Sequence, residues 1–181
     1  MLGLLNDKQN LMTFNFKSKG ACIFLLGASK NDISSSEYLY SFHNVKNSPA
    51  PYFDIEEELK LHKIINRLIK DKLIRSAHDV SDGGLFIALL ESSMPNGLGF
   101  DITTDSDIRT DAFLFGEAQG RVVVSVDNDH EAEFIDTLSK SKVPVTLLGH
   151  VTKGEMRIDD KSFGFVDEAK QRYDNALEEH I

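Results

Sequence analysis

The regular alternation of short apolar runs with amphipathic segments is the feature that most restricts how this chain can fold. Residues 21–29 ("ACIFLLGAS") and 121–127 ("RVVVSVD") are apolar runs of strand length, bounded by glycine or polar residues. The segment that begins at Asp54 instead carries apolar residues at helical spacing. Strands that alternate with helices predict an α/β or α+β fold, in which helices cover a mixed β-sheet.

Composition and charge narrow the class of protein. The chain has 181 residues, which suits one domain, and its single cysteine, Cys22, cannot form an internal disulfide, so we expect a reducing, cytoplasmic location. The net charge of -9 comes without a basic stripe, which argues against nucleic acid as a partner. The apolar runs are shorter than the roughly 20 residues that span a bilayer, and no basic region precedes them at the start of the chain, so no membrane partner or export is expected.

The first half of the chain predicts two strands and two helices. We expect strands at residues 11–16 and 21–29 and a helix that starts with a capping box formed by Ser34 and Glu37. After a proline-containing loop, Asp54 should cap a helix of about 20 residues. The apolar face of that helix is expected to carry Ile55, Leu59, His62, Ile65, Ile69 and Leu73.

The second half predicts the remaining elements of a single domain without internal repeats. Strands are expected at residues 97–104, 121–127, 143–152 and 155–159, and helices at 108–118, 130–141 and 166–180. We interpret residues 1–16 as a linker or end strand of something upstream, and residues 17–181 as the domain itself. Met1 is consistent both with a boundary inside a longer protein and with an initiator methionine.

The stretch "SAHDVSDGGLFIALLESS", Ser76 to Ser93, reads as a strand, a turn and a helix. Ser81 or Asp82 is expected to cap the helix, and Gly83 and Gly84 allow the backbone to approach a neighbour or ligand closely. Asp79 is left over: its carboxylate suits either Mg²⁺ bound to phosphates or the turn amides. His78 has no second His or Cys at ligand spacing, so we expect it to be packed and hydrogen-bonded rather than bound to zinc.

A second group of polar residues lies in the predicted helix-to-strand connection 116–121. Glu117, Gln119 and Arg121 lie there among glycines, where side chains can converge at the end of a strand. An arginine binds phosphate or carboxylate in a forked geometry, and the alternative is a local ion pair with Glu117. The candidate ligand-binding residues are therefore Ser81, Gly83, Gly84, Glu117, Gln119 and Arg121, and the candidate metal ligands are Asp79 and Asp82.

In combination, these stretches resemble a known family. "SAHDVSDGGLFIALLESS", "GLGFDI", "LFGEAQGRVVVSV", "LGHVT" and the segment "DISSSEYL" are similar to the C-terminal AIR synthase-related domain of the phosphoribosylformylglycinamidine synthases, in their small, multi-subunit form. The resemblance implies part of a ligase of de novo purine biosynthesis. Members use ATP and glutamine-derived ammonia to convert formylglycinamide ribonucleotide to the formylglycinamidine.

The same resemblance implies cofactors and partners. These are ATP and Mg²⁺, an upstream ATP-binding domain of the same protein, a glutaminase subunit and a small accessory subunit. The sequence of the turn, "HDVSDGG", is similar to that of the corresponding turn in the last domain of such enzymes. Ala118 in place of a serine and the acidic Asp82 argue against direct substrate binding, so this copy is expected to hold a structural nucleotide or nothing, and the isolated chain to be inactive.

Two alternatives stay open. The first is a non-catalytic scaffold or structural nucleotide-binding module, which would be favoured if Asp79 and Arg121 were buried and mutually satisfied. The second is a sibling ATP-using enzyme, such as a selenophosphate synthetase, a hydrogenase-maturation protein or aminoimidazole ribonucleotide synthetase, which the wording "HDVSDGGL" disfavours.

Overall fold

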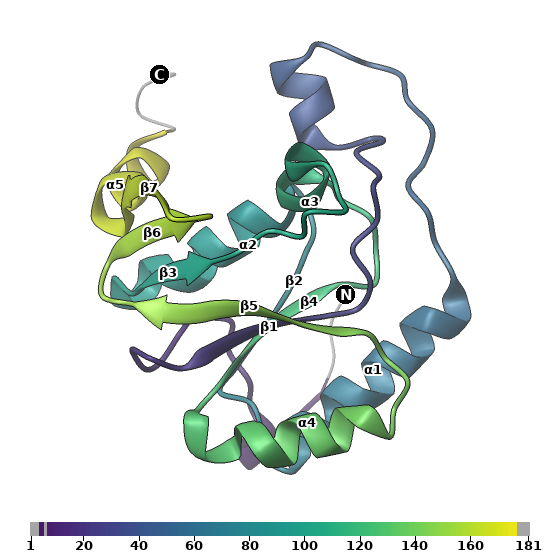
Figure 1. The fold of residues 1–181 in the computed structure, drawn as a ribbon, viewed down its shortest axis with the longest axis vertical. Helices are drawn as coiled ribbons and strands as arrows, with labels where there is room; N and C mark the ends of the chain where they lie inside the picture. Colours follow the sequence, from purple (N-terminus) through teal and green to yellow (C-terminus); the bar gives the residue numbers. More distant parts are fainter. Residues whose placement is uncertain (1–3, 6, 177–181) are drawn as a thin grey trace.

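The computed structural model describes residues 4–5 and 7–176 and contains a seven-stranded sheet in the order β2-β4-β1-β5-β3-β6-β7 (Figure 1). All paired neighbours run antiparallel except β3 and β6, so the predicted mixed sheet is confirmed. The strands are β1 (Cys22–Leu26), β2 (Ser76–Asp79), β3 (Gly99–Ile102), β4 (Val122–Val126), β5 (Val145–Thr152), β6 (Glu155–Ile158) and β7 (Lys161–Phe165).

Helices cover both faces of this sheet (Figure 1). One layer holds α1 (Ile55–Lys70) and α4 (Glu131–Ser139), and the other holds α2 (Gly84–Ser93), α3 (Thr110–Phe115) and α5 (Val166–Asn175). Short turns of 3₁₀ helix lie at Lys8–Asn10, Met94–Asn96 and Asn128–His130, and a π-helical turn at Tyr38–Phe42. Within the described residues, none of the helices is long and apolar enough to cross a membrane.

Burial on both faces explains why the central strands are continuously apolar. Alternate residues of β1 point to opposite sides: Ile23 and Leu25 belong to the core under α2, and Phe24 and Leu26 to the core under α1 and α4. The side chains of the neighbouring strand β4 also alternate between the two cores, and Val123 belongs to the core under α2. The sheet is thus the common wall of two hydrophobic cores.

The predicted strand at residues 11–16 is wrong, although its last residue belongs to the core. The Phe16 side chain is fully buried, and the Phe16 amide donates to the Ser92 carbonyl over 2.8 Å. The Thr13 carbonyl accepts from the Ala77 amide over 3.3 Å. These separate bonds to α2 and β2 hold the segment in place without forming a ladder, and the chain bends at Phe14 and Asn15. The division between residues 1–16 and 17–181 remains a prediction; residues 1–3 and 6 lie outside the described residues.

The capping box predicted at Ser34 is also wrong. The Asp32 carboxylate accepts from the Ser34 amide over 2.9 Å, and the hydroxyl of Ser36 accepts from Leu39 N over 3.3 Å. The turn that follows is π-helical and only five residues long, from Tyr38 to Phe42. A serine two residues later than predicted therefore supplies the side-chain acceptor.

Helix α1 confirms the predicted cap and part of the predicted face. The Asp54 carboxylate accepts from the amides of Glu56 and Glu57 over 2.8 and 3.0 Å. The helix has 16 residues, fewer than expected, and the Leu59 side chain is 43% exposed. The face that meets the sheet carries Leu61, Ile64 and Leu68. Of the predicted face, Ile65, Ile69 and Leu73 also pack against this core, whereas Ile55 and Leu59 are exposed, so the buried apolar stripe is displaced from the predicted one.

In the second half, the other predicted strands and helices form within a few residues of the expected bounds. The helices predicted at 108–118 and 166–180 are described over Thr110–Phe115 and Val166–Asn175, and residues 177–180 lie outside the described part. Strand β7 (Lys161–Phe165) was not predicted; among the described strands it pairs with β6 alone, and its residues are mostly exposed. A strand without a buried face lacks the apolar alternation that identifies strands.

Candidate functional site

The turn between β2 and α2 is built on two glycines in the left-handed region. Gly83 precedes the helix with a φ of 82°, and Gly84, the first helical residue, has a φ of 74°. A Cβ at Gly84 would lie 2.7 Å from the Leu114 carbonyl oxygen and from the Phe115 Cα. The predicted close approach of the backbone to a neighbour is confirmed, and the neighbour is the last turn of α3.

The predicted helix cap at Ser81 or Asp82 is wrong, because neither side chain hydrogen-bonds to an α2 amide. The carboxylate of Glu117 takes this place: its Oε1 accepts from the Gly83 amide over 2.8 Å. The same oxygen accepts from the Glu37 amide over 2.7 Å. One carboxylate therefore joins the β2–α2 turn, the start of the π-helical turn and the α3–β4 connection. Sequence reasoning missed this role, since the three segments are far apart in the chain.

Arg121 is buried beside Glu117 and donates to backbone carbonyls. Its Nε donates to the Ala118 carbonyl over 3.2 Å, and a terminal nitrogen donates to the Gly116 carbonyl. Burial lowers the pKa of Arg121 to about 10, while the charge of Glu117 opposes that shift. The guanidinium stays protonated at neutral pH and holds the loop, but no ion pair with Glu117 forms in the described part of the chain.

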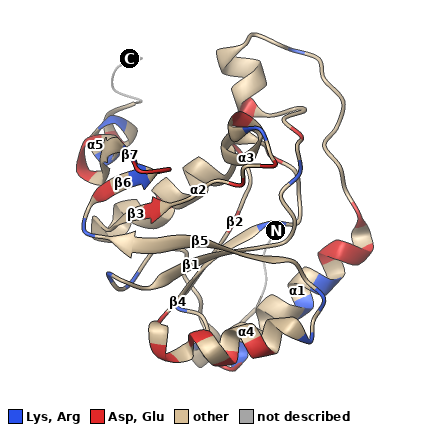
Figure 2. Ribbon diagram, viewed as in Figure 1, with Lys and Arg blue, Asp and Glu red and all other residues tan. Residues whose placement is uncertain are grey.

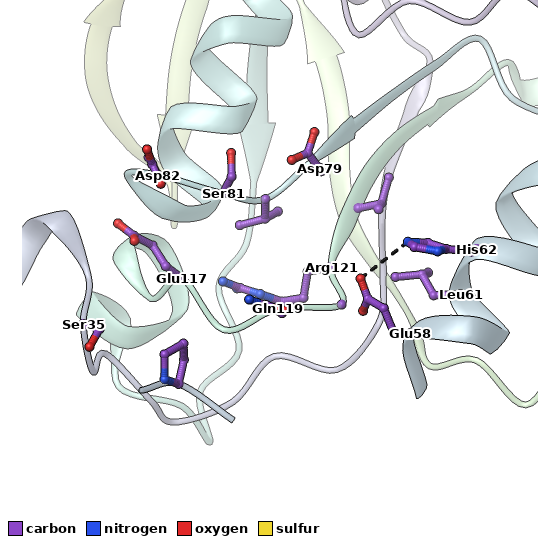
Figure 3. Close-up of a pocket in the computed structure, with 14 residues that line it drawn as sticks. Ser35, Glu58, Leu61, His62, Asp79, Ser81, Asp82, Glu117, Gln119 and Arg121 are labelled. Carbon is purple, nitrogen blue, oxygen red and sulfur yellow. Dashed lines mark ion pairs between the residues drawn. The ribbon is translucent and has the colours of Figure 1, made fainter. Parts of the chain in front are cut away.

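These segments surround a cavity of about 410 Å³ (Figure 3). Asp79, Ser81 and Asp82 lie along one side, and Glu117, Gln119 and Arg121 along the other (Figure 3). Six of the eight predicted site residues thus meet at one cavity, and Gly83 and Gly84 form the helix start beside it. A second hollow of about 400 Å³ shares Ser35, Asp82 and Glu117 with it.

Helix α1 and the loop before it supply a third wall that sequence reasoning missed. Glu58 and His62 come from α1, with 3.5 Å between the Glu58 carboxylate and His62 Nε2. Ser35 and Pro51 come from the ends of the long connection into α1. The i,i+4 spacing of Glu58 and His62 was a usable signal for a polar pair on one helix face, but Ser35 offered none.

His78 lies outside this cavity, and its predicted role is confirmed. Its Nε2 is 2.8 Å from the Glu91 carboxylate, and its ring packs on Phe14 with centroids 5.2 Å apart. It is a packed and hydrogen-bonded histidine.

The donor set of the cavity fits a hard cation better than a bare phosphate. The amide at the start of α2 is taken by Glu117, and Arg121 is taken by carbonyls, while carboxylates dominate the walls. Mg²⁺ is commonly bound by one or two carboxylates together with phosphate oxygens and water. The described residues contain no group of three or more His, Cys, Asp or Glu that could bind a metal without such help.

The seven-stranded mixed sheet has a helical layer on each face and a polar cavity where β2 turns into α2. These features define an α+β domain with a candidate ligand site at that turn. The sequence profile described as "AIR synthase related protein, C-terminal domain" matches residues 18–161. The chain belongs to this family.

Curated relatives agree with that assignment. The chain is 35% identical over 189 aligned residues to the phosphoribosylformylglycinamidine synthase subunit PurL of Chlorobaculum tepidum, covering 98% of this chain and 25% of the relative. It is 34% identical over 158 residues to PurL of Alkaliphilus metalliredigens, covering 87% of this chain and 21% of the relative. The chain thus spans about a quarter of the length of these relatives.

Solved structures share the fold at lower identity. PurL of Thermotoga maritima complexed with FGAR has a TM-score of 0.76 and 16% identity, over 90% of this chain and 30% of that one. The same protein complexed with ATP has a TM-score of 0.69 and 14% identity, over 90% and 28%. The structure of PurLQS from Thermotoga maritima matches with a TM-score of 0.67 and 16% identity, over 83% and 25%.

Proposed function

We propose that this chain is the C-terminal AIR synthase-related domain of a phosphoribosylformylglycinamidine synthase. The whole enzyme would use ATP and glutamine-derived ammonia to convert formylglycinamide ribonucleotide to the formylglycinamidine, as a ligase of purine biosynthesis in the cytoplasm. The observation that carries the proposal is the 35% identity to a PurL subunit over 98% of this chain. Because only a quarter of that relative is covered, the isolated chain should not catalyse the reaction.

In the assembled enzyme, the cavity at the β2–α2 turn would face the upstream ATP-binding domain. Asp79 and Asp82 would hold Mg²⁺, which would supply positive charge next to nucleotide phosphates. Ser81 and Gln119 would contact the ligand by hydrogen bonds, while Glu117, Gly83, Gly84 and Arg121 would keep the turn in place. A glutaminase subunit and a small accessory subunit would be the protein partners, as suggested by the PurLQS structure from Thermotoga maritima.

A chimera tests this proposal. The matched C-terminal quarter of the Chlorobaculum tepidum PurL would be replaced by this chain, and product formation followed with formylglycinamide ribonucleotide, ATP, Mg²⁺ and ammonia. We expect product from the chimera and none from the isolated chain or from the PurL that lacks its last quarter. A chimera that unfolds cooperatively but forms no product would contradict the proposal, and so would turnover by the isolated chain.

A second candidate function, a structural or scaffold module, is favoured by one specific observation. Arg121 is buried and satisfied by Gly116 and Ala118 rather than available to a ligand. Asp79 differs, with a side chain 76% exposed. The double variant Asp79→Asn and Asp82→Asn in the chimera separates the two functions: lost turnover with intact folding supports the metal-binding role, and full turnover supports the scaffold role.

A further inference from the structure

Another concave site lies between residues 9–17 and the connection from α1 to β2. Its volume is about 470 Å³, within the range of small-molecule sites. It shares no lining residue with the cavity at the β2–α2 turn. The lining residues are Gln9, Leu11, Met12, Thr13, Lys17, Lys72, Ile74 and Arg75.

Three cations converge on this hollow in a chain whose net charge is -9. Lys17 donates to the Thr13 hydroxyl and to the Asn15 carbonyl, each over 2.6 Å, and Lys72 donates to the Gln9 carbonyl. These acceptors are neutral, so they orient the two ammonium groups without balancing their charge. Positive charge therefore accumulates at this hollow, whereas acidic residues gather at the starts of α1 and α4 (Figure 2).

Only one acid compensates the three cations. The Asp127 carboxylate lies 3.2 Å from Nε of Arg75, and no other Asp or Glu of the described residues is within ion-pair distance of Lys17, Lys72 or Arg75. Burial and the charge of Arg75 lower the pKa of Lys17. Because the charge of Arg75 disfavours the protonated form of Lys17, a bound anion would stabilise the Lys17 ammonium group.

Three apolar side chains, together with Gln9 and Thr13, form the rest of the walls. Ile74 is buried, Met12 is half-buried and packs against the core under α1, and Leu11 is exposed at the rim. A guanidinium offers a fork that matches carboxylate or phosphate, and Arg75 uses its Nε on Asp127. The wall chemistry thus suits a ligand with a negative group at one end and an apolar body at the other.

We infer that this hollow binds a small organic oxyanion, a carboxylate or phosphate attached to an apolar group, held by Lys17, Lys72 and Arg75. The contacts of Lys17 and Lys72 with the carbonyls of residues 9–15 keep the segment in place and form one wall of the site. Binding would neutralise charge locally and would weaken as salt concentration rises.

The test is a titration of the ¹⁵N-labelled 181-residue chain followed by amide chemical shifts. The probes are phenyl phosphate, benzoate, inorganic phosphate and benzyl alcohol. We expect saturable shifts confined to residues 9–17 and 72–75 with phenyl phosphate or benzoate, and weaker binding of the other two probes. Phenyl phosphate against benzoate distinguishes the two oxyanions. Inorganic phosphate binding as tightly as phenyl phosphate, shifts spread over the whole surface, or no shifts would overturn the inference.

Variants locate the site. Arg75→Gln and Lys72→Gln should each weaken binding of the aromatic anion by about tenfold, because each removes a charged hydrogen-bond donor. Both side chains are exposed enough for the chain to stay folded, and the spectrum itself reports folding. Arg67→Gln, on α1 but outside the hollow and paired with Asp71, is the matched control and should bind as the parent does. Unchanged affinity in both test variants would refute the site.

Discussion

Gly84 shows at the scale of one residue why the turn contains two glycines. Gly84→Ala would place a Cβ 2.7 Å from the backbone of Leu114 and Phe115 at a φ of 74°. Strain and overlap together should cost about 3 kcal/mol of unfolding free energy. Gly20→Ala is the control, because its φ is 85° but nothing lies within 4 Å of the added Cβ; it should cost about 1 kcal/mol. Urea titrations compare the two, and equal losses would contradict the close approach.

Glu117 tests whether one carboxylate holds two segments. Its Oε1 accepts from the Gly83 and Glu37 amides, so Glu117→Ala leaves two donors without an acceptor and should cost about 3 kcal/mol. Glu117→Gln keeps a carbonyl acceptor at the same position and should cost about 1 kcal/mol. Hydrogen exchange at the amides of Glu37 and Gly83 should accelerate together in the alanine variant. Acceleration at only one amide would show that the two contacts are independent.

Helix α1 gives the corresponding test at the scale of an element. Leu68 is fully buried and Leu59 is 43% exposed, although the pattern placed Leu59 on the apolar face. Leu68→Ala should therefore cost about 3 kcal/mol of unfolding free energy, and Leu59→Ala less than about 1 kcal/mol. Thermal and urea unfolding of both variants measures the difference. If Leu59→Ala were the more costly change, α1 would present its other stripe to the sheet.

The connection that precedes α1 should depend on pH through Asp32. Burial raises the pKa of Asp32, whereas hydrogen bonds from Ser34 and from the Tyr52 amide lower it. The hydrogen bonds together have the larger effect, so the net shift of the pKa is downward. A carboxyl with a lowered folded pKa contributes stability above its unfolded pKa and loses it as pH falls. Hydrogen exchange at the Ser34 and Tyr52 amides should therefore increase below the ordinary aspartate range. Asp32→Asn should remove that pH dependence; an unchanged dependence would assign it to another acid.

The local sequence pattern predicted the strands that are buried on both faces. It did not predict features that depend on residues far away in the chain. The runs that became β1 and β4 are apolar because each strand meets two cores, which a single window of sequence records. The choice of face on α1 depends on what packs against it. The acceptor at the start of α2 comes from Glu117, 34 residues away, so no local cap motif could have revealed it.

The same limit applies to the candidate site. Asp79, Ser81 and Asp82 were found because the turn is compact in sequence, and the stretch around Glu117 because its polar residues are close together. Glu58, His62 and Ser35 were missed because tertiary packing alone brings them to the cavity.

At the scale of the whole molecule, the core reaches further toward the N-terminus than the predicted domain start. Phe16 is fully buried in the core under α2, so Phe16→Ala should cost about 3–5 kcal/mol of unfolding free energy. Phe14→Ala, at a side chain 45% exposed, should cost about 1 kcal/mol. Urea unfolding followed by circular dichroism checks both. A small effect at Phe16 would favour the predicted division after residue 16.

The position of β1 in the sheet has a consequence for biosynthesis. Cys22–Leu26 pairs on one side with Val122–Val126 and on the other with β5, more than 100 residues further along the chain. A nascent chain therefore exposes an apolar strand with both edges open until most of the polypeptide has left the ribosome. Pairings of such long sequence separation form slowly and leave aggregation-prone edges uncovered meanwhile. Chaperone occupancy of this strand during translation is the expected result.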